Sequence, residues 1–169
     1  MKKVILITGG QRSGKSEHAE QLALSMSPTP VYLATAHVWD EEFRERVRKH
    51  QERRGPQWTN IEEEMWLSKH NLTGRVVVVD CVTLWLTNIF FHHDSNVQQS
   101  LELAKREFDQ LTKQEATLIF VTNEIGSGGV SENAIQRRFT DLEGWMNQYI
   151  ASKADEVILM VSGITVKIK

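Results

Sequence analysis

The feature that most restricts the fold is a glycine-bounded loop close to the start of the chain. Residues 4–7 are four consecutive apolar residues, which is typical of a buried parallel strand. The loop from Gly9 to Ser16 then has the spacing G-x-x-x-x-G-K-S, and apolar residues recur at helical spacing after it. A strand, this loop and a helix, in that order, indicate a phosphate-binding loop rather than a chance glycine-rich turn.

Each fixed position of the motif has a physical role in holding a polyphosphate. Glycine at positions 9 and 14 permits backbone angles that let successive N–H groups turn toward an anion, and the following helix directs its positive dipole end at the same place. Lys15 is expected to reach the β- and γ-phosphates, and Ser16 to offer its hydroxyl to Mg²⁺. The predicted nucleotide-binding loop consists of Gly9, Gly10, Gln11, Arg12, Ser13, Gly14, Lys15 and Ser16.

Apolar runs and helical patterns alternate along the rest of the chain. The runs at 31–35, 75–80 and 117–122 predict further strands, and 157–161 with 164–168 predict a terminal hairpin. Strand–helix alternation predicts a three-layer α/β fold with a mostly parallel central sheet, and 169 residues fit one domain spanning 1–169. Two buried helix stripes are expected: Ala19, Leu22, Ala23 and Met26, and, in a helix capped by Ser131, Ile135, Phe139, Leu142, Met146, Tyr149 and Ile150.

Composition excludes several classes of partner. A formal net charge of -2 gives no argument for nucleic acid or an acidic membrane surface, and no apolar stretch approaches the length of a membrane span. No charged-then-apolar leader is seen before the phosphate loop. Cys81 is the only cysteine, so a disulfide framework is not expected and a reducing cytoplasm fits.

A strongly charged segment at 39–54 contains the most reactive candidate. Its acids come first and its bases last, as a helix dipole favours. His50 lies on the same face as Val47, and Arg46 and Arg53 are one turn before and after it. One interpretation is a solvated charged helix. The other is chemical: neighbouring positive charge keeps the imidazole neutral and nucleophilic near pH 7, and the arginines neutralise an approaching phosphate.

The strand at 75–80 ends in an acid, Asp80. At the carboxyl edge of a parallel sheet such an acid is expected to organise Mg²⁺ together with Ser16, although it could instead cap the next helix. That helix, 82–91, is apolar nearly all round, which predicts deep burial or cover by another subunit. His92 and His93 follow this helix and are interpreted as polar residues at its end rather than as metal ligands. The acidic segment between Trp58 and Trp66 is interpreted as mostly exposed to solvent.

Together these segments resemble, almost end to end, the bifunctional adenosylcobinamide kinase / adenosylcobinamide-phosphate guanylyltransferase family of cobalamin assembly. The glycine loop alone is shared by many families. The more specific stretches are an Arg-x-x-x-His helix and a Thr-Asn-Glu-Ile-Gly-Ser-Gly run. The resemblance covers residues 8–16, 32–36, 46–50 with Trp58, 80–88, 121–128, 138–142, 147–148 and 154–157.

The resemblance implies a RecA-like phosphate-loop fold that performs two reactions. In the first, ATP or GTP phosphorylates the aminopropanol hydroxyl of adenosylcobinamide. In the second, GTP gives GMP to a histidine, and GMP then passes to adenosylcobinamide phosphate, yielding adenosylcobinamide-GDP. His50 and Lys15 are the implied catalytic residues, and the assembly is implied to be a homotrimer. Beyond the loop, the implied guanine-nucleotide contacts are Ala34, Thr35, Ala36, His50, Gln51, Glu52, Arg53, Glu62 and Asp80.

Two departures from the family pattern concern the shape of the glycine-rich loop and the choice of histidine, not the activity, and two alternative functions are considered beside the family's. Gly129-Val130-Ser131 stands where many relatives have Ile-Val-Pro, and Lys49 stands where some have a second histidine, which leaves His50 as the candidate in that helix. The first alternative function is a phosphate-loop kinase of another small molecule, without a covalent intermediate. The second is a binding or regulatory module that uses nucleotide hydrolysis to change shape.

Overall fold

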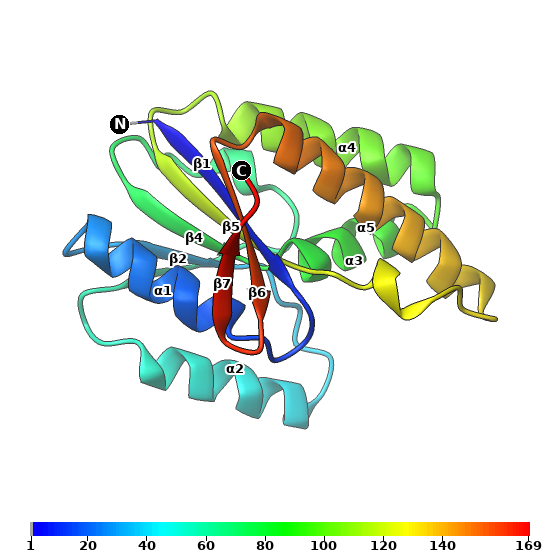
Figure 1. The fold of residues 1–169 in the computed structure, drawn as a ribbon, viewed down its shortest axis with the longest axis horizontal. Coiled ribbons are helices and arrows are strands. Elements are labelled where there is room, and N and C mark those ends of the chain that lie inside the picture. Colours follow the sequence, from blue (N-terminus) through cyan, green and yellow to red (C-terminus); the bar gives the residue numbers. More distant parts are fainter. Residues whose placement is uncertain (1) are drawn as a thin grey trace.

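The computed structural model describes residues 2–169 and contains one seven-stranded sheet. Its strand order is β3-β2-β4-β5-β1-β6-β7, and all neighbours pair in parallel except β6 and β7. The predicted α/β class, the mostly parallel sheet and the terminal hairpin are confirmed (Figure 1). The strands are β1 (Lys3–Gly9), β2 (Val31–Ala34), β3 (Thr59–Glu62), β4 (Val76–Asp80), β5 (Thr117–Asn123), β6 (Glu156–Val161) and β7 (Ile164–Lys167).

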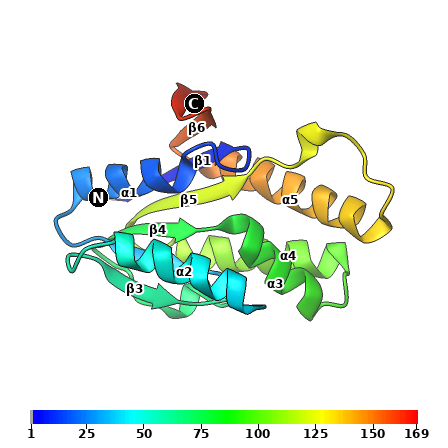
Figure 2. The same cartoon turned by 90° about the horizontal axis from the view of Figure 1, so that it is seen from below.

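Helices cover both faces of this sheet. Figure 2 shows α1 on one side of β4 and β5, and α3 and α4 on the other. In Figure 1, α4 and α5 lie side by side, joined where the Tyr149 hydroxyl donates to Asp109 at 2.7 Å. The helices are α1 (Lys15–Met26), α2 (Glu41–Arg53), α3 (Val82–His92), α4 (Val97–Leu111) and α5 (Ala134–Lys153), with single 3₁₀ turns η1 (Leu67–Lys69) and η2 (Gly126–Gly128).

The buried strands send alternate side chains into two separate cores. Leu6, Val79 and Phe120 point to the face covered by α3, α4 and α5. Ile5 and Ile119 point to the face covered by α1. This is the period-2 geometry of a strand buried on both sides, and it explains why these strands read as continuous apolar runs.

The third helix is buried mainly by its own chain. Trp85, Leu86, Ile89 and Phe90 are 0–1% exposed, so one of the two expectations for the apolar segment 82–91 is met. Phe91 at its end is 52% exposed. No helix within residues 2–169 is both long enough and apolar enough to cross a membrane.

Several local predictions were wrong. Strand β3 was not expected, because an edge strand with mostly exposed polar side chains carries no apolar run. Met26 is 40% exposed instead of buried, since it lies at the end of α1 beyond the sheet contact. Ile135 is 46% exposed, because the first turns of α5 project beyond the sheet with the segment that precedes them (Figure 2). The cap of α5 is Asn133, not Ser131.

Candidate active site

The phosphate loop lies where the sequence places it, between β1 and α1. A Cβ added at Gly9 would come within 2.5 Å of the Met160 carbonyl oxygen, so only glycine fits beside the neighbouring strand. Gly14 has φ +93°, a conformation that side chains disfavour, and it immediately precedes the first turn of α1. The strand–loop–helix context that the motif requires is therefore present.

The C-terminal hairpin supports this loop from behind. The Gly163 N–H in the β6–β7 turn donates to the Ser13 carbonyl at 3.0 Å. A Cβ at Gly14 would lie 3.5 Å from the Gly163 Cα. The loop is thus held by a segment about 150 residues later in the chain, a contact that sequence spacing alone does not reveal.

Lys15 is almost fully buried at the centre of the candidate site. Its Nζ donates to the Gly10 carbonyl at 2.5 Å and to the Ser13 hydroxyl at 3.4 Å. Burial lowers the pKa of Lys15, and the negative charges of nearby acids, Asp80 and Glu143 among them, oppose that shift. The Lys15 ammonium is therefore held over its own loop, and Asp80 of β4 and Glu143 of α5 lie close enough to raise its pKa.

Asp80 ends β4 at the same edge of the sheet. The Tyr32 hydroxyl donates to its Oδ2 at 2.6 Å, and burial together with the Asp80 charge raises the pKa of Tyr32 well above its usual value. Tyr32 therefore remains a neutral donor. The cap of α3 is Cys81, whose sulfur accepts from the Leu84 N–H, so the alternative role for Asp80 as that cap is wrong.

Thr35 joins the ends of β2 and β4 and is fully buried. Its hydroxyl donates to the Cys81 carbonyl at 2.7 Å and accepts from the Cys81 N–H at 2.9 Å. Asn88 of α3 donates to the Thr35 carbonyl at 2.8 Å. The segment Ala34-Thr35-Ala36 is thereby fixed at the sheet edge next to Asp80.

The helix α2 carries His50 on an exposed surface. Asp40 caps the helix by accepting from the Phe43 N–H at 2.8 Å, and none of the helix residues is buried. Over the part of the chain that the structure describes, His50 and Glu52 make no hydrogen bond or ion pair with the loop Gly9–Ser16. The end of α2 is tied in, because Gln51 donates to Glu62 at 3.2 Å and Arg53 to Glu20 at 2.8 Å.

Two acidic residues near the site were not among the residues that the sequence singled out for it. Glu143 of α5 is 1% exposed and accepts from the Thr83 hydroxyl, while its Oε2 has no partner among the described atoms. Burial raises the pKa of Glu143 to about 7. An available signal was its spacing, since it falls four residues after Phe139 and three before Met146, on the apolar stripe of the helix.

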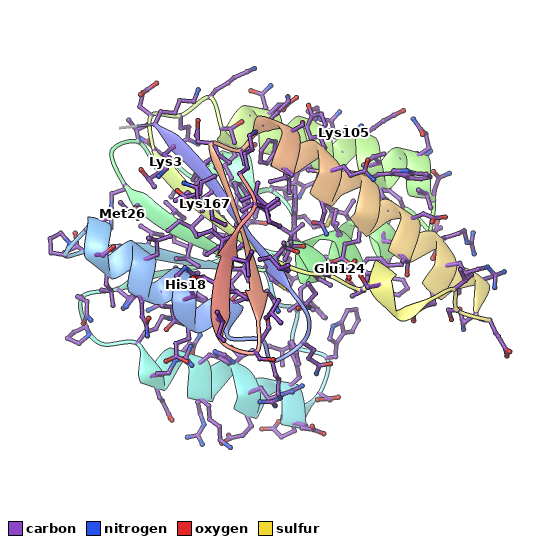
Figure 3. The ribbon with its side chains drawn as sticks, in the orientation of Figure 1. Lys3, His18, Met26, Lys105, Glu124 and Lys167 are labelled. Carbon is purple, nitrogen blue, oxygen red and sulfur yellow. The ribbon has the colours of Figure 1, made fainter. Side chains whose placement is uncertain are left out.

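Glu124, the second of these residues, shapes the glycine-rich turn after β5. It accepts from the N–H groups of Gly126 and Ser127 at 2.9 and 3.2 Å, and the bonds to Ser127 are the main reason that its pKa is lowered. Figure 3 shows Glu124 at the end of β5, beside η2.

Glu63 corrects the expectation that the acidic segment before Trp66 is mostly solvated, because its side chain is buried and accepts from the N–H groups of Met65 and Trp66. Burial by itself would raise the pKa of Glu63, but these bonds and those to Lys69 and His70 lower it to about 2.

The oxygen-bearing side chains fit Mg²⁺ bound chiefly through phosphates and water. Ser16 and Asp80 offer hard oxygen ligands from α1 and β4, and no cluster of three or more His, Cys, Asp or Glu able to hold a metal occurs within residues 2–169. Mg²⁺ usually takes one or two protein oxygens and completes its octahedron with phosphate and water. His92 and His93 pack ring against ring, 5.1 Å apart, with no such ligand set.

Comparison with known proteins identifies the family to which this chain belongs. Residues 5–168 match the family model described as cobinamide kinase / cobinamide phosphate guanyltransferase. The chain belongs to this family. It is 37% identical to the bifunctional adenosylcobalamin biosynthesis protein CobU of Escherichia coli, over 98% of this chain and 99% of that protein. It is also 37% identical to CobP of Pseudomonas aeruginosa, which bears the same description, over 97% and 96%.

The fold likeness extends to a more distant protein. The flagellar accessory protein FlaH from Methanocaldococcus jannaschii aligns with a TM-score of 0.51 over 99% of this chain and 78% of its own, at 15% identity. At that identity the similarity concerns the fold alone. The family members, in contrast, match along nearly their whole length.

Proposed function

We propose that this chain is a single-domain transferase, spanning 1–169, that phosphorylates adenosylcobinamide and then transfers GMP from GTP to the product. The observation that carries the proposal is the intact phosphate loop, with Lys15 buried beside Asp80, in a chain that matches the family from residue 5 to 168. ATP or GTP serves as the phosphate donor, and GTP as the GMP donor.

In the kinase step, the aminopropanol hydroxyl attacks the γ-phosphorus. A new O–P bond forms, the bond to the β-phosphate oxygen breaks, and the hydroxyl proton is released. The N–H groups of Gly9–Ser16 and the ammonium of Lys15 stabilise the charge on the transferred group. Mg²⁺, held by Ser16 and Asp80, would add charge neutralisation at the β- and γ-phosphates.

In the second step, the lone pair of a ring nitrogen of His50 attacks the α-phosphorus of GTP. An N–P bond forms and the bond to pyrophosphate breaks. A phosphate oxygen of adenosylcobinamide phosphate then attacks the same phosphorus and releases His50. Arg46 supplies positive charge one turn before His50, whereas Arg53, one turn after it, is paired with Glu20 at 2.8 Å.

Binding of GTP is proposed to use both the sheet edge and α2. Support comes from the fixed segment Ala34–Ala36 and from the bond between Gln51 and Glu62, which holds the end of α2 against β3. Glu52, paired with Arg48 at 3.1 Å, completes the proposed contacts on α2.

The test separates the two reactions by removing the proposed nucleophile. For His50→Ala we expect GMP transfer to fall below detection, because no N–P bond can form, while phosphoryl transfer and GTP binding stay within about 3-fold of the unchanged protein. His92→Ala, which removes another exposed histidine, is the control and should retain both activities.

Normal GMP transfer by the His50 variant would contradict the proposal. If both histidine variants lost GMP transfer, the loss could not be attributed to removal of the His50 nucleophile. Absence of any GMP transfer in the unchanged protein, with phosphoryl transfer to some alcohol retained, would favour a kinase of another small molecule.

A homotrimer in the cytoplasm completes the proposal. Support comes from large apolar side chains left exposed near the site edge and on α5, which a second copy could cover. A molar mass near three times 19.4 kDa by sedimentation equilibrium is the expected result. The exposed side chains are Trp39, Phe91, Val130, Ile135 and Trp145.

A further inference from the structure

The helix that carries His50 is attached to the rest of the molecule at one end. No residue of α2 is buried, so an apolar face does not anchor it. Its middle forms ion pairs within the helix, such as Arg48 with Glu45 at 2.7 Å. Contacts with other elements come from its last residues, where Arg53 reaches Glu20 of α1. Whatever fixes this end of α2 therefore also fixes the position of His50.

The most buried of these end contacts is made by Arg54, the residue that terminates α2. Its side chain is 2% exposed. Its guanidinium carbon lies 3.5 Å from the centroid of the Tyr32 ring, and its Nε donates to the side-chain oxygen Oδ1 of Asn60 at 3.1 Å. A guanidinium stacked on an aromatic ring and shielded from water is held more firmly than an exposed one.

Tyr32 extends this contact to the phosphate site. Its hydroxyl donates to Oδ2 of Asp80 at 2.6 Å, and the edge of its ring meets Trp58, with ring centroids 6.0 Å apart. The three side chains Asp80, Tyr32 and Arg54 thus form a continuous connection from the end of β4 to the end of α2. His50 lies one helical turn before Arg54.

We infer that Tyr32 and Arg54 are positioning residues for GMP transfer: they fix the His50 end of α2 relative to Asp80 and the phosphate loop. The inference rests on the proposed role of His50 as nucleophile. Attack on phosphorus requires the ring nitrogen at a defined position, and a misplacement of about 1 Å can cost on the order of 100-fold in rate. Phosphoryl transfer does not use His50, so this connection affects one reaction more than the other.

The test compares two Tyr32 variants with a matched control. Tyr32→Leu removes the ring below Arg54 and the hydroxyl on Asp80, whereas Tyr32→Phe removes the hydroxyl alone. Tyr149→Phe is the control, because Tyr149 also donates to a carboxylate, at 2.7 Å, and also has a cation over its ring, but lies on α5 against α4.

For Tyr32→Leu we expect guanylylation of His50 at saturating GTP to slow by about 10–100-fold. The GTP dissociation constant and the rate of phosphoryl transfer should change by less than about 3-fold. Tyr32→Phe should change the rates of both reactions by less than about 3-fold, since the ring under Arg54 remains and the lost bond to Asp80 serves both reactions alike. Equal losses in both reactions would overturn the inference, because Tyr32 would then act through Asp80 alone.

Amide hydrogen exchange of the peptide 41–53 tests the contact without any chemistry. It should be faster in Tyr32→Leu than in the unchanged protein, and unaltered in Tyr149→Phe. Unaltered exchange in both Tyr32 variants would overturn the inference, whatever the chemistry. If the unchanged protein forms no GMP adduct while exchange responds as expected, the nucleophile assignment fails and the positioning contact stands. If the leucine variant does not fold, Arg54→Met decides by the same criteria, because it removes the guanidinium from the Tyr32 ring and leaves the bond from Tyr32 to Asp80.

Discussion

At the scale of single residues, the site holds two buried groups of opposite charge whose environments disfavour ionisation. Lys15 has its pKa lowered by burial, and Glu143 has its pKa raised by burial to about 7. Each charge partly stabilises the other, because Lys15 lowers the pKa of Glu143 and Glu143 raises that of Lys15. We expect a polyphosphate on the loop to compete with Glu143 for the Lys15 ammonium, and we therefore expect this acid to influence both nucleotide binding and stability.

The Glu143 carboxyl predicts a pH dependence of stability. Below pH 4.5 it is protonated in the folded and the unfolded chain and contributes nothing. Between pH 4.5 and about 7 the unfolded chain loses the proton while the folded chain keeps it, so the free energy of unfolding falls as pH rises and then levels off. The full shift corresponds to about 3 kcal/mol.

Glu143→Gln is therefore expected to stabilise the protein at pH 8 by up to about 3 kcal/mol and to give no such gain at pH 4. Urea unfolding at both pH values measures this. Glu132→Gln, at an exposed glutamate just before α5, should change neither value. An equal effect of Glu143→Gln at both pH values would show that the carboxyl does not titrate in this range.

At the scale of elements, the predictions that succeeded rest on local patterns, and those that failed concern contacts between distant segments. β1, β4, β5 and β6 contain continuous apolar runs and β7 alternates apolar and polar residues, and both patterns predict strands without tertiary information. β3 has no such run and pairs through its backbone with β2 alone, so only the assembled sheet reveals it. The first turns of α5 likewise show that a local pattern does not reveal what covers it. The apolar pattern of Ile135 and Phe139 continues beyond the part of the helix that the sheet covers.

The cap of α5 gives a test at this scale. The Asn133 side chain accepts from the N–H groups of Ile135 and Gln136 at 2.9 and 3.0 Å, whereas Ser131 accepts from Asn133. Removing a cap costs about 1 kcal/mol, which corresponds to roughly 5-fold in local opening. In Asn133→Ala, amides 135–139 should therefore exchange about 5-fold faster. Ser131→Ala is the control, and an equal effect there would mean that both residues cap the helix.

At the scale of the whole molecule, the strand order explains why distant motifs meet. β1, β2, β4 and β5 are parallel, so the phosphate loop, the segment 34–36, Asp80 and the turn at Glu124 all follow strand ends at one edge of the sheet. This grouping could be predicted from the sequence, because parallel strands with helical crossovers place their carboxyl ends together. The connection through Tyr32 and Arg54 could not, since it depends on side-chain contacts across three elements.

The central claim is that one chain with a single phosphate loop also forms a covalent GMP-histidine. The most direct test is to incubate the purified protein with Mg²⁺ and GTP labelled at its α-phosphate, denature it, and map the label by mass. The account predicts an acid-labile GMP adduct on His50. Its absence while GTP is demonstrably bound, or an adduct on another residue, would contradict it.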